Sequence, residues 1–132
     1  LGVQNRFIAL NADVRFRPPV NMGQYDIIVS NPPYVTRAEM RELDRSVYHY
    51  EPHEALYGGV DGLDFYRSIC SKWGSLLVPG GIILFECGWQ QATDVAAILE
   101  ENRFAGIGIT EDLAGVPRIV YGYNTEINDP LE

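Results

Sequence analysis

The sequence is poor in the features that mark several specialised classes of protein. Only two of its 132 residues are cysteines. Cys70 and Cys87 each lie inside an apolar segment without a CxxC spacing, so we expect two reduced, buried thiols and no disulfide or metal site. No apolar run reaches the length of a membrane span, and no secretory signal opens the chain. These absences predict a cytoplasmic protein with no membrane partner.

Basic residues are also scarce. Ten Lys and Arg stand against 18 Asp and Glu, and the formal net charge is −8. No cluster of Lys and Arg extends beyond a few positions, whereas non-specific binding of duplex nucleic acid depends on neutralising its phosphates. The charge balance therefore disfavours nucleic acid as the main partner.

The order of the expected elements predicts an α/β layer fold. Tyr25 to Ser30 (YDIIVS) is a nearly continuous apolar run, typical of a strand covered on both faces in a parallel sheet. Residues 63–77 carry apolar side chains at helical spacing. The other elements that we expect are strands at 6–10, 82–87, 104–110 and 118–123 and a helix over 92–99. Nothing helical separates the last two strands, so we expect them to pair antiparallel at the end of an otherwise alternating chain.

The most informative motif is Asn31-Pro32-Pro33-Tyr34, directly after the strand at 25–30. Ligands of open α/β sheets bind outside the C-terminal ends of parallel strands, and the motif falls at such an end. Pro32 keeps Asn31 out of helical geometry, and the second proline stiffens the turn, so its carbonyl groups can face a cavity at little entropic cost. A proline-rich turn without function is the alternative, which the position after a buried strand disfavours.

Such a turn suits transfer of a group to a flat nitrogen. An amide NH2, or the exocyclic amine of a nucleic-acid base, is a poor nucleophile because its lone pair is delocalised. The Asn31 side-chain oxygen and the Pro32 carbonyl can accept its two N–H bonds, aim the nitrogen and favour the positive charge that develops there. Tyr34 can stack on the flat group. No strong base is needed, since the proton leaves easily after alkylation.

At these residues the chain resembles the amino-methyltransferases that carry an Asn-Pro-Pro-Tyr motif, and among them it is similar to the release factor glutamine methyltransferases. The matching stretches are SNPPYV (30–35), EPHEALYGGVDGL (51–63), LVPGGI (77–82), ECGWQQ (86–91) and DLAGVPR (112–118). DNA adenine and ribosomal RNA methyltransferases share the first stretch, whereas the second favours a protein glutamine substrate. The resemblance implies the Rossmann-like sheet of class I methyltransferases, mostly parallel with an antiparallel terminal hairpin.

The resemblance further implies methyl transfer from S-adenosylmethionine to the side-chain amide nitrogen of a protein glutamine, in release factors within a Gly-Gly-Gln loop. Carried over by position, the implied residues are Asn31 and Pro32 holding the amide, Tyr34 lining the pocket, Pro33 and Glu51 beside the substrate, and Asp13 with Asn31 at the cofactor. The alternatives are methylation of a nucleic-acid base or of a ribosomal-protein glutamine, and a non-catalytic interaction module.

Parts of the family pattern are missing from residues 1–132. The Gly-rich cofactor loop, the acidic ribose-binding residue and the helical N-terminal domain would all precede Leu1. We therefore expect a partial methyltransferase domain, the C-terminal half of the catalytic domain, which by itself binds the cofactor weakly or is inactive. The strand at 6–10 would lack its neighbours, and its open edge favours self-association.

Two further features admit more than one interpretation. His49 and His53 are four residues apart, but Pro52 between them disfavours a regular helix, so we expect loop histidines rather than metal ligands. Glu86 ends a buried strand. It is either a partly desolvated acid that assists substrate or cofactor placement, or a hydrogen-bonded strand-end acid.

Overall fold

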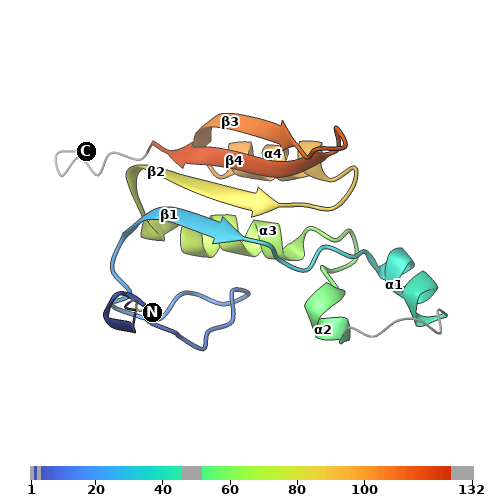
Figure 1. Cartoon of the computed structure of the whole chain (residues 1–132), viewed down its shortest axis with the longest axis horizontal. Coiled ribbons are helices and arrows are strands. Elements are labelled where there is room, and N and C mark those ends of the chain that lie inside the picture. The colour runs from blue at the N-terminus through green and yellow to red at the C-terminus, as the bar shows by residue number, and fades with distance from the viewer. Residues whose placement is uncertain (1, 3, 46–51, 126–132) are drawn as a thin grey trace.

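The computed structural model describes residues 2, 4–45 and 52–125, which form a four-stranded sheet with helices on one face (Figure 1). The strands lie in the order β1-β2-β4-β3. β1 and β2 pair parallel, whereas β4 is antiparallel to both of its neighbours. The α/β class and the antiparallel terminal hairpin are thus confirmed, and the parallel part is the β1–β2 pair. The strands are β1 (Tyr25–Ser30), β2 (Leu77–Glu86), β3 (Phe104–Glu111) and β4 (Pro117–Asn124).

Helices connect the strands. The expected periodicity of residues 63–77 produces a continuous helical run from α3 (Asp64–Ser68) through the π-helical turn η2 (Ile69–Trp73) to the 3-10 turn η3 (Gly74–Leu76). The second expected helix is α4 (Ala92–Glu101), between β2 and β3. Figure 1 shows α3 and α4 behind the strands. Between helices and sheet lies the core, whose most deeply buried side chains are Tyr66, Leu77, Ile83, Phe85, Val95, Leu99 and Val120.

Three short helical elements lie outside these layers: η1 (Gln4–Arg6), α1 (Arg37–Asp44) and α2 (His53–Leu56). A reciprocal capping box starts α1, because the Thr36 hydroxyl accepts from the Glu39 N–H and the Glu39 carboxylate accepts from the Thr36 N–H, each at 3.1 Å. The long connection between β1 and α3 is therefore partly helical. No helix among the described residues is long and apolar enough to cross a membrane.

The strand expected at residues 6–10 is wrong. This segment is irregular after η1, and Phe7 and Ile8 are 69% and 84% exposed. A strand needs a neighbour that pairs its N–H and C=O groups, and no described strand runs beside this segment. An apolar pattern alone therefore did not suffice to make a strand here.

β2 begins at Leu77, earlier than the expected residue 82. Pro79-Gly80-Gly81 thus lies within β2, and the pairing with β1 shifts register between Leu77 and Ile82. A Cβ on Gly81 would lie 3.0 Å from the Asp26 carbonyl oxygen. Glycine here lets β1 and β2 stay close through the irregular stretch.

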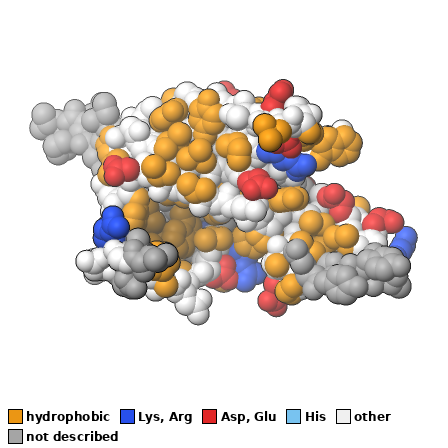
Figure 2. All heavy atoms as spheres, viewed as in Figure 1, with side chains coloured by type: hydrophobic (Ala, Val, Ile, Leu, Met, Phe, Trp, Pro, Cys, Tyr) orange, Lys and Arg blue, Asp and Glu red, His pale blue; other side chains and the backbone are white. Residues whose placement is uncertain are grey.

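The face of the sheet opposite the helices is rich in apolar side chains. Figure 2 shows hydrophobic side chains gathered over this face. Ile27 and Val29 of β1 are 58% and 75% exposed, so the expectation that this strand is covered on both faces is wrong. Tyr123 of β4, across the sheet, is 39% exposed. β1 also ends the strand order, so its outer edge lacks a strand partner among the described residues. Exposed apolar faces and open edges are typical of surfaces that pack against another element.

Candidate active site

The candidate site lies at the edge of the sheet where the parallel strands β1 and β2 end. β1 leads directly into Asn31-Pro32-Pro33-Tyr34, and β2 leads into the loop at 87–91. Asn31 is exposed, Pro32 is buried and Tyr34 is half-buried. The turn therefore exposes the polar side chain of Asn31 to solvent, while the next residue, Pro32, anchors the turn in the protein interior.

Main-chain hydrogen bonds tie the turn to a second segment of the chain. The Val35 N–H donates to the Leu56 carbonyl at 2.8 Å, and the Gly58 N–H donates to the Val35 carbonyl at 2.9 Å. These bonds form a parallel bridge between Val35 and Tyr57. Backbone groups thus fix the position of Val35, directly after the turn.

Glycines allow the surrounding segments to approach the turn closely. A Cβ on Gly58 would lie 2.6 Å from the Pro33 carbonyl oxygen and 2.7 Å from the Tyr34 Cα. One on Gly62 would lie 2.3 Å from the Tyr34 carbonyl oxygen. One on Gly88 would lie 2.6 Å from Cδ2 of the Tyr34 ring. Any larger residue at these positions would displace the turn.

The Gln91 side chain joins three segments at the same place. Its Nε2 donates to the Tyr34 carbonyl at 3.0 Å and, in a longer contact of 3.5 Å, to the Gly62 carbonyl. Its Oε1 accepts from the Gly88 N–H at 2.9 Å. The backbone and the ring of Tyr34 are therefore both held by neighbouring segments.

A cavity of about 740 Å³ opens beside the turn, a volume within the range of small-molecule sites. Asp13 and Pro33 lie in its wall, so two of the sequence-predicted residues meet there. The side chains of Asn31, Pro32 and Tyr34 do not line it. The other lining residues are Asn11, Ala12, Val14, Arg15, His53, Glu54, Tyr57, Gly59, Asp64 and Phe65.

Asp13 enters the cavity wall as a carboxylate. Arg15 Nε lies 3.0 Å from Asp13 Oδ1, Arg15 Nη2 lies 2.6 Å from Oδ2, and the Arg15 N–H donates to Oδ1 at 2.9 Å. These hydrogen bonds lower the pKa of Asp13 to about 2. The ion pair is exposed and adds little stability, but it orients the carboxylate.

The segment that carries Asp13 is held by the helical run. Three consecutive carbonyls, at residues 14 to 16, accept hydrogen bonds from side chains of this run. The pairs are Ser68 Oγ to the Val14 carbonyl at 2.6 Å, Lys72 Nζ to the Arg15 carbonyl, and Trp73 Nε1 to the Phe16 carbonyl at 2.9 Å. The segment therefore keeps its place at the cavity without being a strand.

Two of the residues weighed from the sequence, His49 and Glu51, lie outside the described residues. His53 lies in the cavity wall, and its Nε2 is 2.6 Å from Asp44 Oδ1. Within residues 4–45 and 52–125, no group of three or more His, Cys, Asp and Glu side chains is placed to hold a metal ion. His53 is the first residue of the short helix α2, so the expectation of a loop histidine is wrong for this residue.

Burial decides the state of the two cysteines. Cys70 and Cys87 are free and buried, as expected. Burial raises the pKa of the Cys70 thiol to about 12 and also raises the pKa of the Cys87 thiol.

Glu86, the last residue of β2, is exposed rather than partly desolvated, and its backbone carbonyl accepts a hydrogen bond from the hydroxyl of the buried Tyr66 at 2.8 Å. The idea that a desolvated Glu86 assists placement is thus not supported.

Sequence reasoning did not single out Gln91, Gly58 or Lys72. Gln91 and Gly58 belong to the stretches ECGWQQ and EPHEALYGGVDGL, which carried the family resemblance. Both stretches meet the Asn-Pro-Pro-Tyr turn in space, so their co-occurrence was the available signal. Lys72 offered no signal, because a lysine on a helix is ordinarily a solvated residue.

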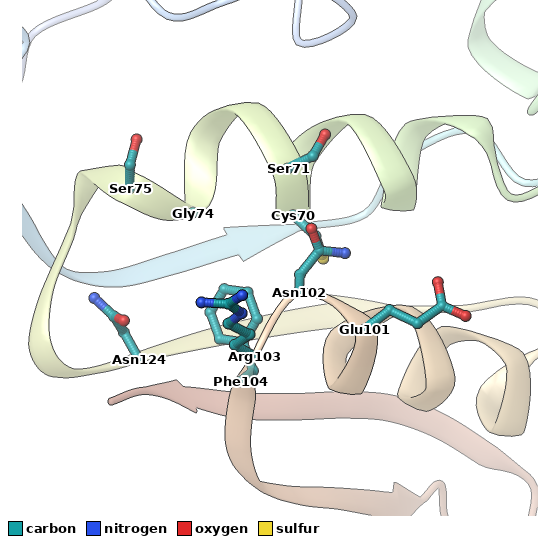
Figure 3. A pocket seen from close by; sticks show the side chains of 9 residues that line it. All are labelled: Cys70, Ser71, Gly74, Ser75, Glu101, Asn102, Arg103, Phe104 and Asn124. Carbon is teal, nitrogen blue, oxygen red and sulfur yellow. The ribbon is translucent and has the colours of Figure 1, made fainter. Parts of the chain in front are cut away.

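A second, smaller hollow of about 280 Å³ lies at the opposite end of the sheet (Figure 3). It is formed where η3 and the end of α4 meet the start of β3 and the end of β4. The labelled lining residues are Cys70, Ser71, Gly74, Ser75, Glu101, Asn102, Arg103, Phe104 and Asn124. None of the sequence-predicted site residues lies there.

The chain is similar to curated release factor glutamine methyltransferases. The relative from Clostridium acetobutylicum is 42% identical over 120 residues, which are 91% of this chain and 42% of the relative. The relative from Fusobacterium nucleatum is 37% identical over 126 residues, 91% of this chain and 36% of the relative. The chain thus spans less than half the length of these relatives. No family model matches the chain.

One solved structure with a related description is the release factor-specific protein-(glutamine-N5) methyltransferase from Alicyclobacillus acidocaldarius. It is 26% identical to this chain, with a TM-score of 0.48. The match covers 78% of this chain and 50% of that structure.

Proposed function

Because the chain belongs to the release factor glutamine methyltransferase family, we propose that the protein transfers a methyl group from S-adenosylmethionine to the side-chain amide nitrogen of a glutamine. The proposed substrate is a peptide-chain release factor, methylated within its Gly-Gly-Gln loop. The observation that carries the proposal is the Asn31–Tyr34 turn at the end of β1, beside a cavity whose wall contains both Pro33 and Asp13.

The residues in the cavity wall fit one end of this cofactor. S-adenosylmethionine supplies an electrophilic methyl carbon on a positively charged sulfur. Asp13 presents an ionised carboxylate, fixed by Arg15, that can accept the N–H bonds of the adenine amine. In this family, the hydrogen-bonding groups for the rest of the cofactor are expected from a Gly-rich loop and an acidic residue, and residues 1–132 contain neither. On this proposal the 132 residues are part of a methyltransferase domain.

The substrate amide is held by the turn. The Asn31 side-chain oxygen and the Pro32 carbonyl accept the two N–H bonds of the glutamine NH2 and direct its nitrogen toward the methyl group. As the N–C bond forms and the C–S bond breaks, these oxygens stabilise the positive charge growing on the nitrogen. The nitrogen then loses a proton to water. Tyr34 acts by fixing the turn, since its ring lies on Gly88 rather than in the cavity wall.

A methyl-transfer assay tests the proposal directly. The protein at its natural length is incubated with S-adenosylmethionine labelled in its methyl group and with a release factor, bare DNA or bare RNA. We expect label in the release factor and none in either nucleic acid. A release factor whose loop glutamine is changed to glutamate is the matched control and should remain unlabelled. Label in nucleic acid alone would refute the proposal.

A further inference from the structure

The side chain of Gln91 does not cap the helix that it precedes and instead contacts a distant segment of the chain. Gln91 is the N-cap residue of α4, a position where Ser, Thr, Asp and Asn are preferred because their side chains bond to the first turn. The Gln91 side chain makes no such cap bond. It extends instead to the Tyr34 carbonyl, 57 positions earlier in the sequence.

The groups around Gln91 need a donor and an acceptor from the same side chain. The carbonyls of Tyr34 and Gly62 require a hydrogen-bond donor, and the Gly88 N–H requires an acceptor. Glutamine presents both from one planar group. An ionised glutamate would keep the acceptor for Gly88 but would place an oxygen against the Tyr34 carbonyl.

The hydrogen bond between Gln91 and Tyr34 is connected to the Pro32 carbonyl, one of the proposed acceptors, by a short and stiff stretch of backbone. Tyr34 follows Pro33, whose ring fixes φ, and Pro33 follows the Pro32 carbonyl proposed to hold the substrate amide. The chain therefore has few ways to absorb a shift of Tyr34 before it reaches Pro32. Gly62 and Gly88 close the remaining space around Tyr34, because neither position has room for a Cβ.

We propose that Gln91 is a positioning residue, which sets the direction of the Pro32 carbonyl by holding Tyr34. This inference rests on the proposed methyl transfer to an amide. Misplacement of a reacting group by about 1 Å can lower a rate by about 100-fold. Loss of the Gln91 contact should therefore lower turnover while leaving the cofactor end of the cavity, around Asp13, unchanged.

The test compares Gln91→Glu with Gln90→Glu in the protein at its natural length. Gln90 is exposed and adjacent, so the control introduces the same charge beside the same loop. For Gln91→Glu we expect kcat to fall roughly 10- to 100-fold, with the Kd for S-adenosylmethionine within about twofold of the unsubstituted protein. Gln90→Glu should leave both quantities nearly unchanged.

A pH profile separates positioning from general damage. A protonated carboxyl offers one O–H donor for the Tyr34 carbonyl and one acceptor for the Gly88 N–H, so the kcat of Gln91→Glu relative to the unsubstituted protein should rise as the pH falls from 8 to 5.5. A flat ratio, a cofactor Kd that rises in step with the loss of kcat, or an equal loss in Gln90→Glu would overturn the inference. If the unsubstituted protein instead methylates another planar amine with the same Gln91 dependence, the proposed function fails and the inference stands.

Discussion

Two segments, the turn at 31–34 and the segment at 13–16, approach the same cavity but are held in opposite ways. The turn is fixed mainly by main-chain hydrogen bonds and by glycines that leave no room for a side chain, and one side chain, that of Gln91, adds a bond to the Tyr34 carbonyl. The segment at 13–16 is irregular, and side chains of the helical run donate to its carbonyls. A backbone arrangement tolerates little change, whereas separate side-chain contacts can be lost one at a time. The difference suggests that geometry matters most on the side proposed for the substrate.

The largest expected effect is on the turn itself. Asn31→Ala removes one of the two proposed acceptors, and loss of one such group from a preorganised site lowers kcat by about 100- to 1,000-fold. The Kd for S-adenosylmethionine should change by less than about threefold, because Asp13 is untouched. Asn5→Ala, an exposed asparagine far along the chain from the turn, is the control and should behave like the unsubstituted protein. Turnover within about twofold of normal in Asn31→Ala would contradict the proposed role.

A steric test of the turn comes next. Gly58→Ala forces a Cβ against the Pro33 carbonyl and should lower the free energy of unfolding by about 3 kcal/mol, measured by urea denaturation. Gly80→Ala is the comparison, since Gly80 has a φ of 81° and open space around it. Its expected cost is about 1 kcal/mol, from backbone conformation alone. Equal losses would mean that the close approach at Gly58 is unimportant.

The segment at 13–16 should respond more gently. Ser68→Ala removes one donor, that to the Val14 carbonyl, and should destabilise the protein by about 1 kcal/mol. We expect a severalfold weaker Kd for S-adenosylmethionine and an unchanged kcat at saturating cofactor. Ser71→Ala is the matched control, because its hydroxyl reaches only the Ser68 carbonyl, at 3.4 Å. A fall in the kcat of Ser68→Ala at saturating S-adenosylmethionine would contradict the claim that the segment at 13–16 acts on cofactor binding alone.

The smallest effect on stability is expected at Asp13. Its pKa is about 2, below the ordinary value of 3.8. The lowered pKa means that any stabilisation by the Arg15 pair is present above pH 3.8 and is lost as the pH falls toward 2. Because the pair is exposed, Asp13→Asn should leave the melting temperature at pH 7 almost unchanged while weakening the cofactor Kd. A clear drop in melting temperature would assign Asp13 a structural role instead.

The open face and edge of β1 give a prediction about association. Ile27 and Val29 expose apolar surface beside an edge without a described strand partner. The open edge expected at 6–10 does not form, because that segment is not a strand. We propose instead that the 132 residues by themselves self-associate through the β1 edge, and that Val29→Lys reduces the association. Sedimentation over a wide concentration range measures it. A single monomeric species at all concentrations would count against the proposal.

Local patterns predicted the elements whose own residues determine them. The apolar runs of β1 and β4, the periodicity behind α3 and η2, and the alternation of β3 were sufficient because each element packs at least one side chain against the same core. The segment at 6–10 has a strand-like composition but no pairing partner. Its structure depends on what lies beside it, which its own residues do not reveal.

The site was predictable only in part for the same reason. Asn31-Pro32-Pro33-Tyr34 is contiguous, and its position directly after an apolar strand is visible in the sequence. The contact between Gln91 and Tyr34 joins residues 57 positions apart, and so does the one between Lys72 and Arg15. Such pairs depend on how the loops meet at the sheet edge, which periodicity and turn chemistry do not specify.

The central claim is that paired oxygens at the turn bind the two N–H bonds of one amide, and a comparison of substrate with product tests it most directly. The methylated glutamine retains one N–H, so one acceptor is left without a partner, which costs about 1–3 kcal/mol. In the presence of S-adenosylhomocysteine, the protein should bind an unmethylated release factor at least about fivefold more tightly than the methylated one. Asn31→Ala should remove most of that difference. Equal affinity of the unsubstituted protein for both forms would contradict the claim.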